Sequence, residues 1–170
     1  GKGRFEMYDQ ESSNMFLDSI KAFSDVDLFP FQRDMDEKPA HYKDQAIYIH
    51  PQFEKIFQQT KELGLIPAIF NEEDGGMQMP NSLFHAAYYL MEAANNHVTG
   101  YLGLTTGAAN LIATFGSQEL KDTYLPKMLD MEWTGTMCLT EPQAGSSLSD
   151  ITTTATPTAN GSYLINGQKI

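Results

Sequence analysis

Residues 137–147 read MCLTEPQAGSS, and this stretch decides the fold because the character of the chain changes here. Residues 136–140 favour a β-strand, whereas the chain before Trp133 has the apolar spacing of helices. Pro142 fixes φ and lacks an N–H, so the strand must end in a sharp turn. Gly145 then allows a ligand to approach the backbone closely. The stretch therefore predicts that a β region begins directly after a helical one.

Three hydroxyl side chains lie close together in this stretch, those of Thr140, Ser146 and Ser147. Hydroxyl and backbone N–H donors suit a polar heteroaromatic ring or a pyrophosphate, both of which present acceptor atoms. The alternative is an ordinary β-turn whose hydroxyls bond to their own backbone. Local chemistry alone favours the ordinary turn.

Towards the N-terminus the apolar pattern is helical. Helices are predicted over residues 12–24, 51–64, 82–98, 99–115 and 118–130. Ser12 or Ser13 is suited to cap the first of them, Asn81 the third and Ser117 the last. Residues 25–50 are irregular and hold two prolines, so we expect a loop with short helical pieces.

Towards the C-terminus the pattern is that of strands. ITTTATP at residues 151–157 is rich in β-branched residues, and Asn160-Gly161 is typical of a hairpin turn before YLI at 163–165. QKI at 168–170 begins a further strand. One strand and a hairpin cannot bury both faces of a sheet. We therefore expect the protein to continue past this point, or another chain to supply the rest.

The predicted fold class is mainly α. Residues 1–133 are expected to form an N-terminal, bundle-like helical domain, and residues 134–170 the incomplete beginning of an antiparallel β domain. The chain has 170 residues, of which 41% are hydrophobic, so it can bury a sizeable core.

Composition excludes several classes of function. The formal net charge of −11 argues against general nucleic-acid binding, which needs a basic face. No apolar run is long enough to span a bilayer, and the N-terminus lacks the apolar stretch of a signal peptide. The four histidines show no metal-ligand spacing, so no metal site is expected. Cys138 is the single cysteine, which excludes an intrachain disulfide and favours a reducing compartment.

Four segments, taken in order, resemble the acyl-CoA dehydrogenase family. These are ELGLIPAIFNEEDGG (62–76), FGSQELKDTYLPKMLDMEWTG (115–135), CLTEPQAGSS (138–147) and YLINGQKI (163–170). The third resembles the flavin-binding signature of that family. The resemblance covers about residues 12–170 and is weakest over 25–50.

The resemblance implies a subunit of three parts, in which FAD lies against a middle β domain. Met137, Leu139 and Thr140 match strand positions that line the isoalloxazine ring, and the Thr typically bonds to it near its reactive nitrogen. Gly145 and Ser146 match the turn that meets the FAD pyrophosphate. Ser146 also matches a contact to the neighbouring thioester substrate.

One departure from the family pattern concerns the residue after Gly-Ser. The family commonly has Asp there, whereas this chain has Ser147, with Asp150 three residues further on. This difference puts any role of that carboxylate in doubt. A serine can still make the hydrogen bond that such a turn requires.

The resemblance also implies an activity, the oxidation of acyl-CoA thioesters to 2,3-enoyl-CoA. A Glu base removes the α-proton while a β-hydride passes to flavin N5. That base belongs to the C-terminal part of the family, so no catalytic residue is expected in these 170 residues. Glu141 is interpreted as structural, holding the strand end and the turn. Leu104 to Ala109 match the wall of the acyl pocket, although Gly103 and Gly107 also suit plain tight helix packing.

The expected partners are an acyl-CoA substrate and electron-transfer flavoprotein, in a homodimer or homotetramer, located in the cytoplasm or, in a eukaryote, the mitochondrial matrix. Three alternatives stay open. A related acyl-CoA oxidase would return electrons to oxygen. A non-catalytic flavoprotein or interaction module would keep the fold without the reaction. A helical scaffold would neither bind flavin nor catalyse the reaction, and the turn at 140–147 makes this alternative the least favoured.

Overall fold

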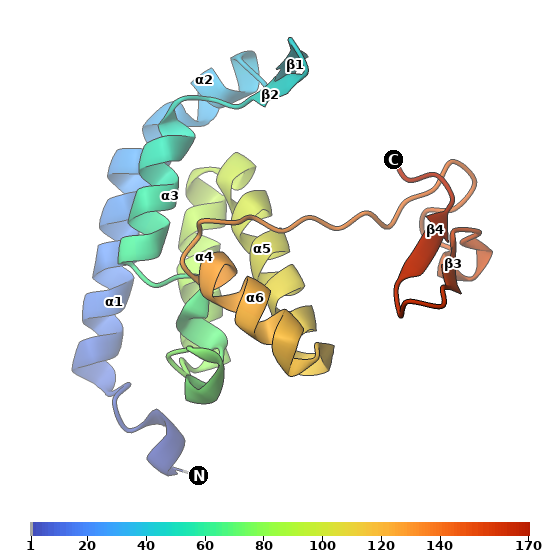
Figure 1. Ribbon diagram of the computed structural model, residues 1–170. Coiled ribbons are helices and arrows are strands. Elements are labelled where there is room, and N and C mark those ends of the chain that lie inside the picture. Colours follow the sequence, from blue (N-terminus) through green and yellow to red (C-terminus); the bar gives the residue numbers. More distant parts are fainter. Residues whose placement is uncertain (1) are drawn as a thin grey trace. The chain divides into compact units, whose positions relative to one another are not determined.

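The computed structural model describes residues 2–170 (Figure 1). The chain forms two compact units, one ending at Thr136 and the other spanning Met137–Ile170. We call them the helical unit and the hairpin unit. The first consists mainly of helices, and the second contains an antiparallel pair of strands, which confirms the predicted fold class. The assignment of residues 1–133 and 134–170 to two domains stays a prediction.

The helical unit begins with a short 3-10 turn, η1 (Lys2–Phe5), and the amphipathic helix α1 (Gln10–Phe23). Its N-cap is Asp9, whose carboxylate accepts the Ser12 N–H at 2.8 Å. The prediction of a serine cap was therefore wrong. The carboxylate of Asp9 also accepts from the Ser12 hydroxyl, so the serine supports the cap from inside the first turn.

Residues 24–50 are more ordered than the sequence indicated. A π-helical turn η2 (Ser24–Leu28), a 3-10 turn η3 (Phe29–Phe31) and the short helix α2 (Gln32–Glu37) confirm the helical pieces. Strands β1 (His41–Lys43) and β2 (Ala46–Tyr48) then form an antiparallel hairpin that was not predicted.

The turn of this hairpin is formed by Asp44 and Gln45, with φ of 50° and 62°. It lacks the glycine by which such turns are recognised in a sequence.

Helix α3 (Gln52–Glu62) follows, with Pro51 at its N-cap. Two 3-10 turns, η4 (Pro67–Ile69) and η5 (Glu72–Asp74), lead to three longer helices. These are α4 (Asn81–Ala94), α5 (Asn96–Phe115) and α6 (Gln118–Leu129). Ser117 caps α6 as predicted, and Pro126 lies inside α6 without ending it. The boundary predicted at 98/99, between the third and fourth predicted helices, was wrong, because the break between α4 and α5 falls at Asn95.

The core of the helical unit lies where α1 packs on α4, α4 on α5, and α5 on α6. Ile20, Ile56 and Val98 are completely buried there, and Met91 is almost so. Each such side chain contributes about 1.5–3 kcal/mol through removal of its apolar surface from water. This packing fixes α4 and α5 against each other, which matters for the cavity described below.

The hairpin unit pairs β3 (Thr154–Pro157) with β4 (Tyr163–Asn166) in antiparallel register, and Gly161 has a φ of 82° in the turn between them. The predicted hairpin is confirmed. The strands predicted at 136–140 and 168–170 are not paired strands. The Ile170 N–H donates to the Thr140 carbonyl at 3.0 Å, but neither segment has the ladder of bonds that defines a strand.

Two negative findings concern the part of the chain that the structure describes. None of its helices is both long and apolar enough to cross a membrane. Within residues 2–170, no three His, Cys, Asp or Glu side chains are grouped so as to hold a metal ion.

Candidate functional site

The turn predicted at the Glu-Pro pair is present in the hairpin unit. Glu141 and Ala144 exchange two backbone hydrogen bonds, with N···O distances of 2.8 and 3.1 Å, and Pro142 and Gln143 form its tip. Proline is suited to this place because it fixes φ and needs no N–H partner. Glu141 itself is 2% exposed, so the turn begins with a buried carboxylate.

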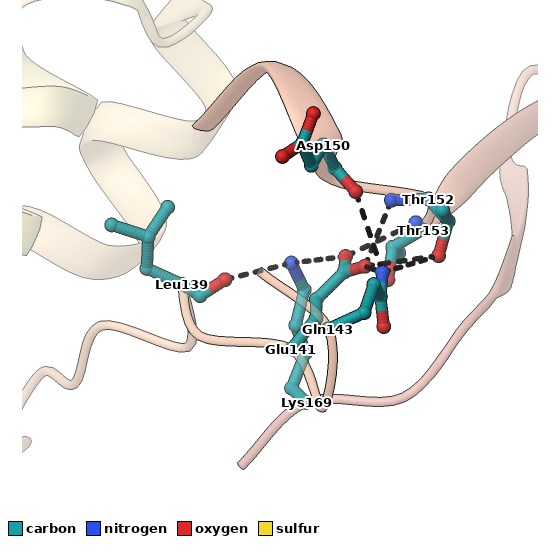
Figure 2. Close-up of polar contacts among 7 residues, drawn as sticks. All are labelled: Leu139, Glu141, Gln143, Asp150, Thr152, Thr153 and Lys169. Atoms are coloured by element: carbon teal, nitrogen blue, oxygen red, sulfur yellow. Dashed lines mark hydrogen bonds and ion pairs between the residues drawn. The ribbon is translucent and has the colours of Figure 1, made fainter. Parts of the chain in front are cut away.

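The Glu141 carboxylate gathers donors from three parts of the hairpin unit (Figure 2). It accepts the backbone N–H of Thr152 at 2.8 Å and of Thr153 at 3.1 Å. It also accepts the Thr152 hydroxyl at 3.0 Å, the Gln143 amide at 2.7 Å and the Lys169 ammonium at 2.9 Å. A buried carboxylate is costly unless its charge is compensated, and here five donors, one of them a cation, compensate it.

These contacts keep the carboxylate ionised. The Thr153 side chain, the Lys169 ammonium and the Thr152 N–H together hold the pKa of Glu141 well below its usual range, because each favours the charged form. The bond from Thr153 that is well formed is that of its N–H at 3.1 Å, since its hydroxyl is buried without a hydrogen-bond partner among the described residues. Glu141 is therefore a fixed anion at neutral pH.

Three further bonds extend this cluster. Gln143 also donates to the Thr152 hydroxyl at 2.9 Å, and to the Asp150 carbonyl at 3.4 Å. Lys169 also donates to the Leu139 carbonyl at 3.2 Å. The cluster thus closes the loop 142–151, which contains the 3-10 turn η6 (Leu148–Asp150), and ties it to the segment before the turn (Figure 2).

The five residues predicted to contact the flavin all lie in the hairpin unit, on either side of this cluster, and all are exposed. They are Met137, Leu139, Thr140, Gly145 and Ser146. Met137 is 66% exposed. A β-carbon at position 145 would have no atom of the described residues within 4 Å, so the fold itself does not require glycine there.

This set of groups fits a flavin nucleotide. Exposed apolar side chains suit the flat ring, while a hydroxyl and an open glycine suit the acceptor oxygens of a diphosphate. Ser147, the departure from the family pattern, has its hydroxyl 3.2 Å from that of Ser149. Its side chain therefore makes a contact within the turn, as the sequence allowed. The binding roles of the five residues stay predictions.

A separate cavity of about 340 Å³ lies in the helical unit, between α4 and α5. Its lining is Ile69, Phe84, His85, Tyr88, Gly103, Thr106, Gly107 and Asn110. Thr106 and Gly107 belong to the wall expected at 104–109, whereas Leu104 is not part of the lining.

The glycines of this cavity differ in what they do. A β-carbon at Gly103 would lie 2.6 Å from the Tyr88 hydroxyl, which donates to the Thr99 carbonyl at 2.5 Å. Gly103 thus permits tight helix packing. A β-carbon at Gly107 would meet nothing within 4 Å, so this glycine leaves the cavity open.

A larger hollow of about 680 Å³ lies beside α6, and its lining is charged. Lys61 pairs there with Asp130 at 2.6 Å, and Lys121 with Asp74 at 3.5 Å. Because these charges already have partners and water access, this hollow suits an apolar ligand far less than the cavity between α4 and α5 does.

Comparison with known proteins gives a family match. Residues 10–132 match the model of the acyl-CoA dehydrogenase N-terminal domain. A butyryl-CoA dehydrogenase of Syntrophomonas wolfei is 33% identical over 164 residues, which cover 90% of this chain and 27% of the relative.

Solved structures give the same result. Butyryl-CoA dehydrogenase from Megasphaera elsdenii superposes with a TM-score of 0.76 at 26% identity, covering 93% of this chain and 39% of that one. A structure of the electron transferring flavoprotein of Acidaminococcus fermentans gives 0.77 at 27% identity, covering 95% and 40%. The chain spans about a quarter of the length of the curated relatives that it matches.

Proposed function

The chain belongs to the acyl-CoA dehydrogenase family, and from this we propose that the protein oxidises an acyl-CoA thioester to the 2,3-enoyl-CoA with FAD as cofactor. The observation that carries the proposal is the family match over residues 10–132, which spans α1 to α6. The turn at 141–147 supports it independently, because it follows the matched region and has the chemistry of a flavin contact.

FAD, when bound, supplies the acceptor for the two electrons that leave the substrate. We assign its ring to Met137, Leu139 and Thr140, and its pyrophosphate to Gly145 and Ser146. Ser146 is also assigned to the substrate thioester. These groups are exposed, and they need little rearrangement to meet a ligand.

We assign the acyl chain to the cavity between α4 and α5. Phe84, Tyr88 and Ile69 give it apolar walls, and Gly107 keeps it open. An acyl chain gains free energy from leaving water, at about 0.8 kcal/mol for each buried CH₂ group. The charged hollow beside α6 offers no such gain.

Glu141 is not the base that removes the α-proton. A general base must have a free lone pair within reach of the substrate and a pKa near the operating pH. Glu141 is buried, accepts five hydrogen bonds and has a strongly lowered pKa. We propose, from the family resemblance, that the base lies outside residues 1–170.

Electron-transfer flavoprotein is the proposed electron acceptor, and the similarity to a chain in a solved structure of such a flavoprotein supports it. The alternative is an acyl-CoA oxidase, in which oxygen takes this place. We further propose a homodimer or homotetramer, in the cytoplasm or, in a eukaryote, the mitochondrial matrix.

The experiment is an anaerobic titration of the complete, flavin-loaded protein with a panel of acyl-CoA esters. Bleaching of the oxidised-flavin absorbance by at least one ester is expected, with the free acids and CoA alone as controls. Oxygen uptake during turnover would identify an oxidase. A flavin that no ester reduces would contradict the enzyme and favour a non-catalytic flavoprotein.

A further inference from the structure

One buried carboxylate joins segments that are far apart in the hairpin unit. Thr152 lies 11 residues after Glu141, and Lys169 lies 28 residues after it. Both bond to the same side chain, which is 2% exposed (Figure 2). A buried, multiply bonded carboxylate of this kind holds its partners in one geometry, because each lost bond would leave a desolvated charge.

The loop enclosed by these contacts contains the predicted pyrophosphate contacts. Gly145 and Ser146 lie between the turn that starts at Glu141 and the Thr152 N–H that the same carboxylate accepts. Gly145 has open space around its α-carbon, so packing does not hold it. The position of these two residues therefore depends on how the ends of the loop are fixed.

The same cluster reaches the other predicted flavin segment through Lys169. Its ammonium bridges the Glu141 carboxylate at 2.9 Å and the Leu139 carbonyl at 3.2 Å. Leu139 is the middle residue of the three assigned to the flavin ring. A single ion pair thus fixes both the segment assigned to the ring and the loop assigned to the diphosphate.

We propose that Glu141 and Lys169 act together as positioning residues of the flavin site, holding residues 137–140 and 145–146 in the register that the cofactor needs. This inference rests on the proposed function. Neither residue touches the reacting atoms in this assignment. The ammonium also neutralises the carboxylate, which would otherwise repel a cofactor diphosphate.

The test compares two variants of the complete protein that make the same chemical change, Glu141→Gln and the control Asp150→Asn. Asp150 lies in the same loop, is exposed, and Figure 2 shows its carboxylate pointing away from Glu141. Glu141→Gln loses the ion pair and brings an amide N–H against the donors of Thr152 and Thr153. We expect it to weaken flavin binding by about tenfold or more. Asp150→Asn should bind flavin as the wild type does.

Amide hydrogen exchange of the flavin-free protein separates positioning from folding. Exchange of residues 142–153 should accelerate in Glu141→Gln, while that of α4 and α5 stays unchanged. Acceleration throughout the helical unit would overturn the proposal, since it would indicate general instability. Wild-type flavin affinity in Glu141→Gln would overturn it as well.

A second pair of variants tests the cation. Lys169→Met should weaken flavin binding in the same way, and Lys169→Arg, which keeps the charge and the donors, should retain most of it. Equal affinities of these two variants would overturn the role of the ion pair. A wild-type protein that binds no flavin at all would instead refute the proposed function, so the two failures are distinguishable.

Discussion

At the scale of the residue, Gly167 shows how closely the hairpin unit packs around its carboxylate. A β-carbon at this position would lie 2.1 Å from the Thr153 hydroxyl oxygen and 2.8 Å from the Thr153 α-carbon. Thr153 cannot move away freely, because its N–H is bonded to Glu141. Glycine is therefore required at 167, whereas Gly145 has no neighbour that a β-carbon would meet.

We predict that Gly167→Ala lowers the free energy of unfolding of the hairpin unit by about 1–3 kcal/mol. The matched variant Gly145→Ala should change it by less than about 0.5 kcal/mol. Hydrogen exchange of residues 154–166 under increasing urea measures both. Equal stability of the two variants would show that the Thr153 contact relaxes without cost.

The sequence predicts the role of Glu141 but not its partners. A Glu-Pro pair at a strand end indicates a structural turn, and the turn is present. Thr152, Thr153 and Lys169 have no local signal that marks them, because their contact arises only after the hairpin β3–β4 folds back. Spacing rules describe the apolar period within one helix or strand. They do not predict contacts between residues that are 11 or 28 positions apart in the sequence.

At the scale of the element, Asn95 separates α4 from α5. Its backbone is extended, with φ −163° and ψ 96°, and its side-chain oxygen accepts the His97 N–H at 3.2 Å as an N-cap. The side-chain amide donates to the Leu28 carbonyl at 3.1 Å, although Asn95 is completely buried. One side chain therefore starts a helix and satisfies a buried carbonyl of η2.

We predict that Asn95→Ala destabilises the helical unit by about 1–3 kcal/mol, because it removes a cap and leaves the Leu28 carbonyl unpaired. The neighbour Asn96 is exposed, so Asn96→Ala is the matched control and should cost much less. Urea unfolding followed by circular dichroism measures the difference. Similar losses in both variants would contradict the role given to the Asn95 side chain.

Elements with an amphipathic stripe were predicted well, and so was the hairpin β3–β4, whose Asn160-Gly161 turn gives a clear signal. Other segments that depend on pairing were not. Residues 12–24 and 118–130 show the helical period, and α1 and α6 match them within a few residues. The segment 136–140 has strand-type residues, but an extended segment becomes a strand only through a partner. In the hairpin β1–β2 the strands do pair, but the prediction missed them because the turn residues Asp44 and Gln45 give no glycine signal.

At the scale of the whole molecule, the two units differ in how much apolar surface they bury, so we expect them to differ in stability. The helical unit holds the large apolar core, with Ile20, Ile56 and Val98 completely buried. All residues of β3 and β4 are exposed, so the hairpin unit depends on the Glu141 cluster and its turns instead. The sequence predicts this contrast, because amphipathic helices end near Trp133 and a short β region follows.

The segment between the last helix and the Glu141 turn is where a protease should act first. Residues 134–140 form neither helix nor paired strand. The Gly135 N–H bonds to the Thr105 hydroxyl at 3.0 Å and Lys169 holds the Leu139 carbonyl, so the exposed stretch between these two points is expected to open first. Cleavage requires a segment to open locally, which costs least where few buried contacts hold the backbone. Trp133 is better held. The centroid of its ring lies 5.9 Å from that of Tyr124 and 4.3 Å from Lys127 Nζ.

We therefore predict that brief digestion of the 170-residue chain with proteinase K first cuts between residues 134 and 140. The large product should keep its helical circular dichroism, because α1 to α6 and their core lie on one side of the cut. Mass spectrometry of early time points locates the cut, and digestion in urea provides the unfolded control. First cuts inside α4 or α5 would mean that the helical core opens more easily than this segment, against the burial that the structure shows.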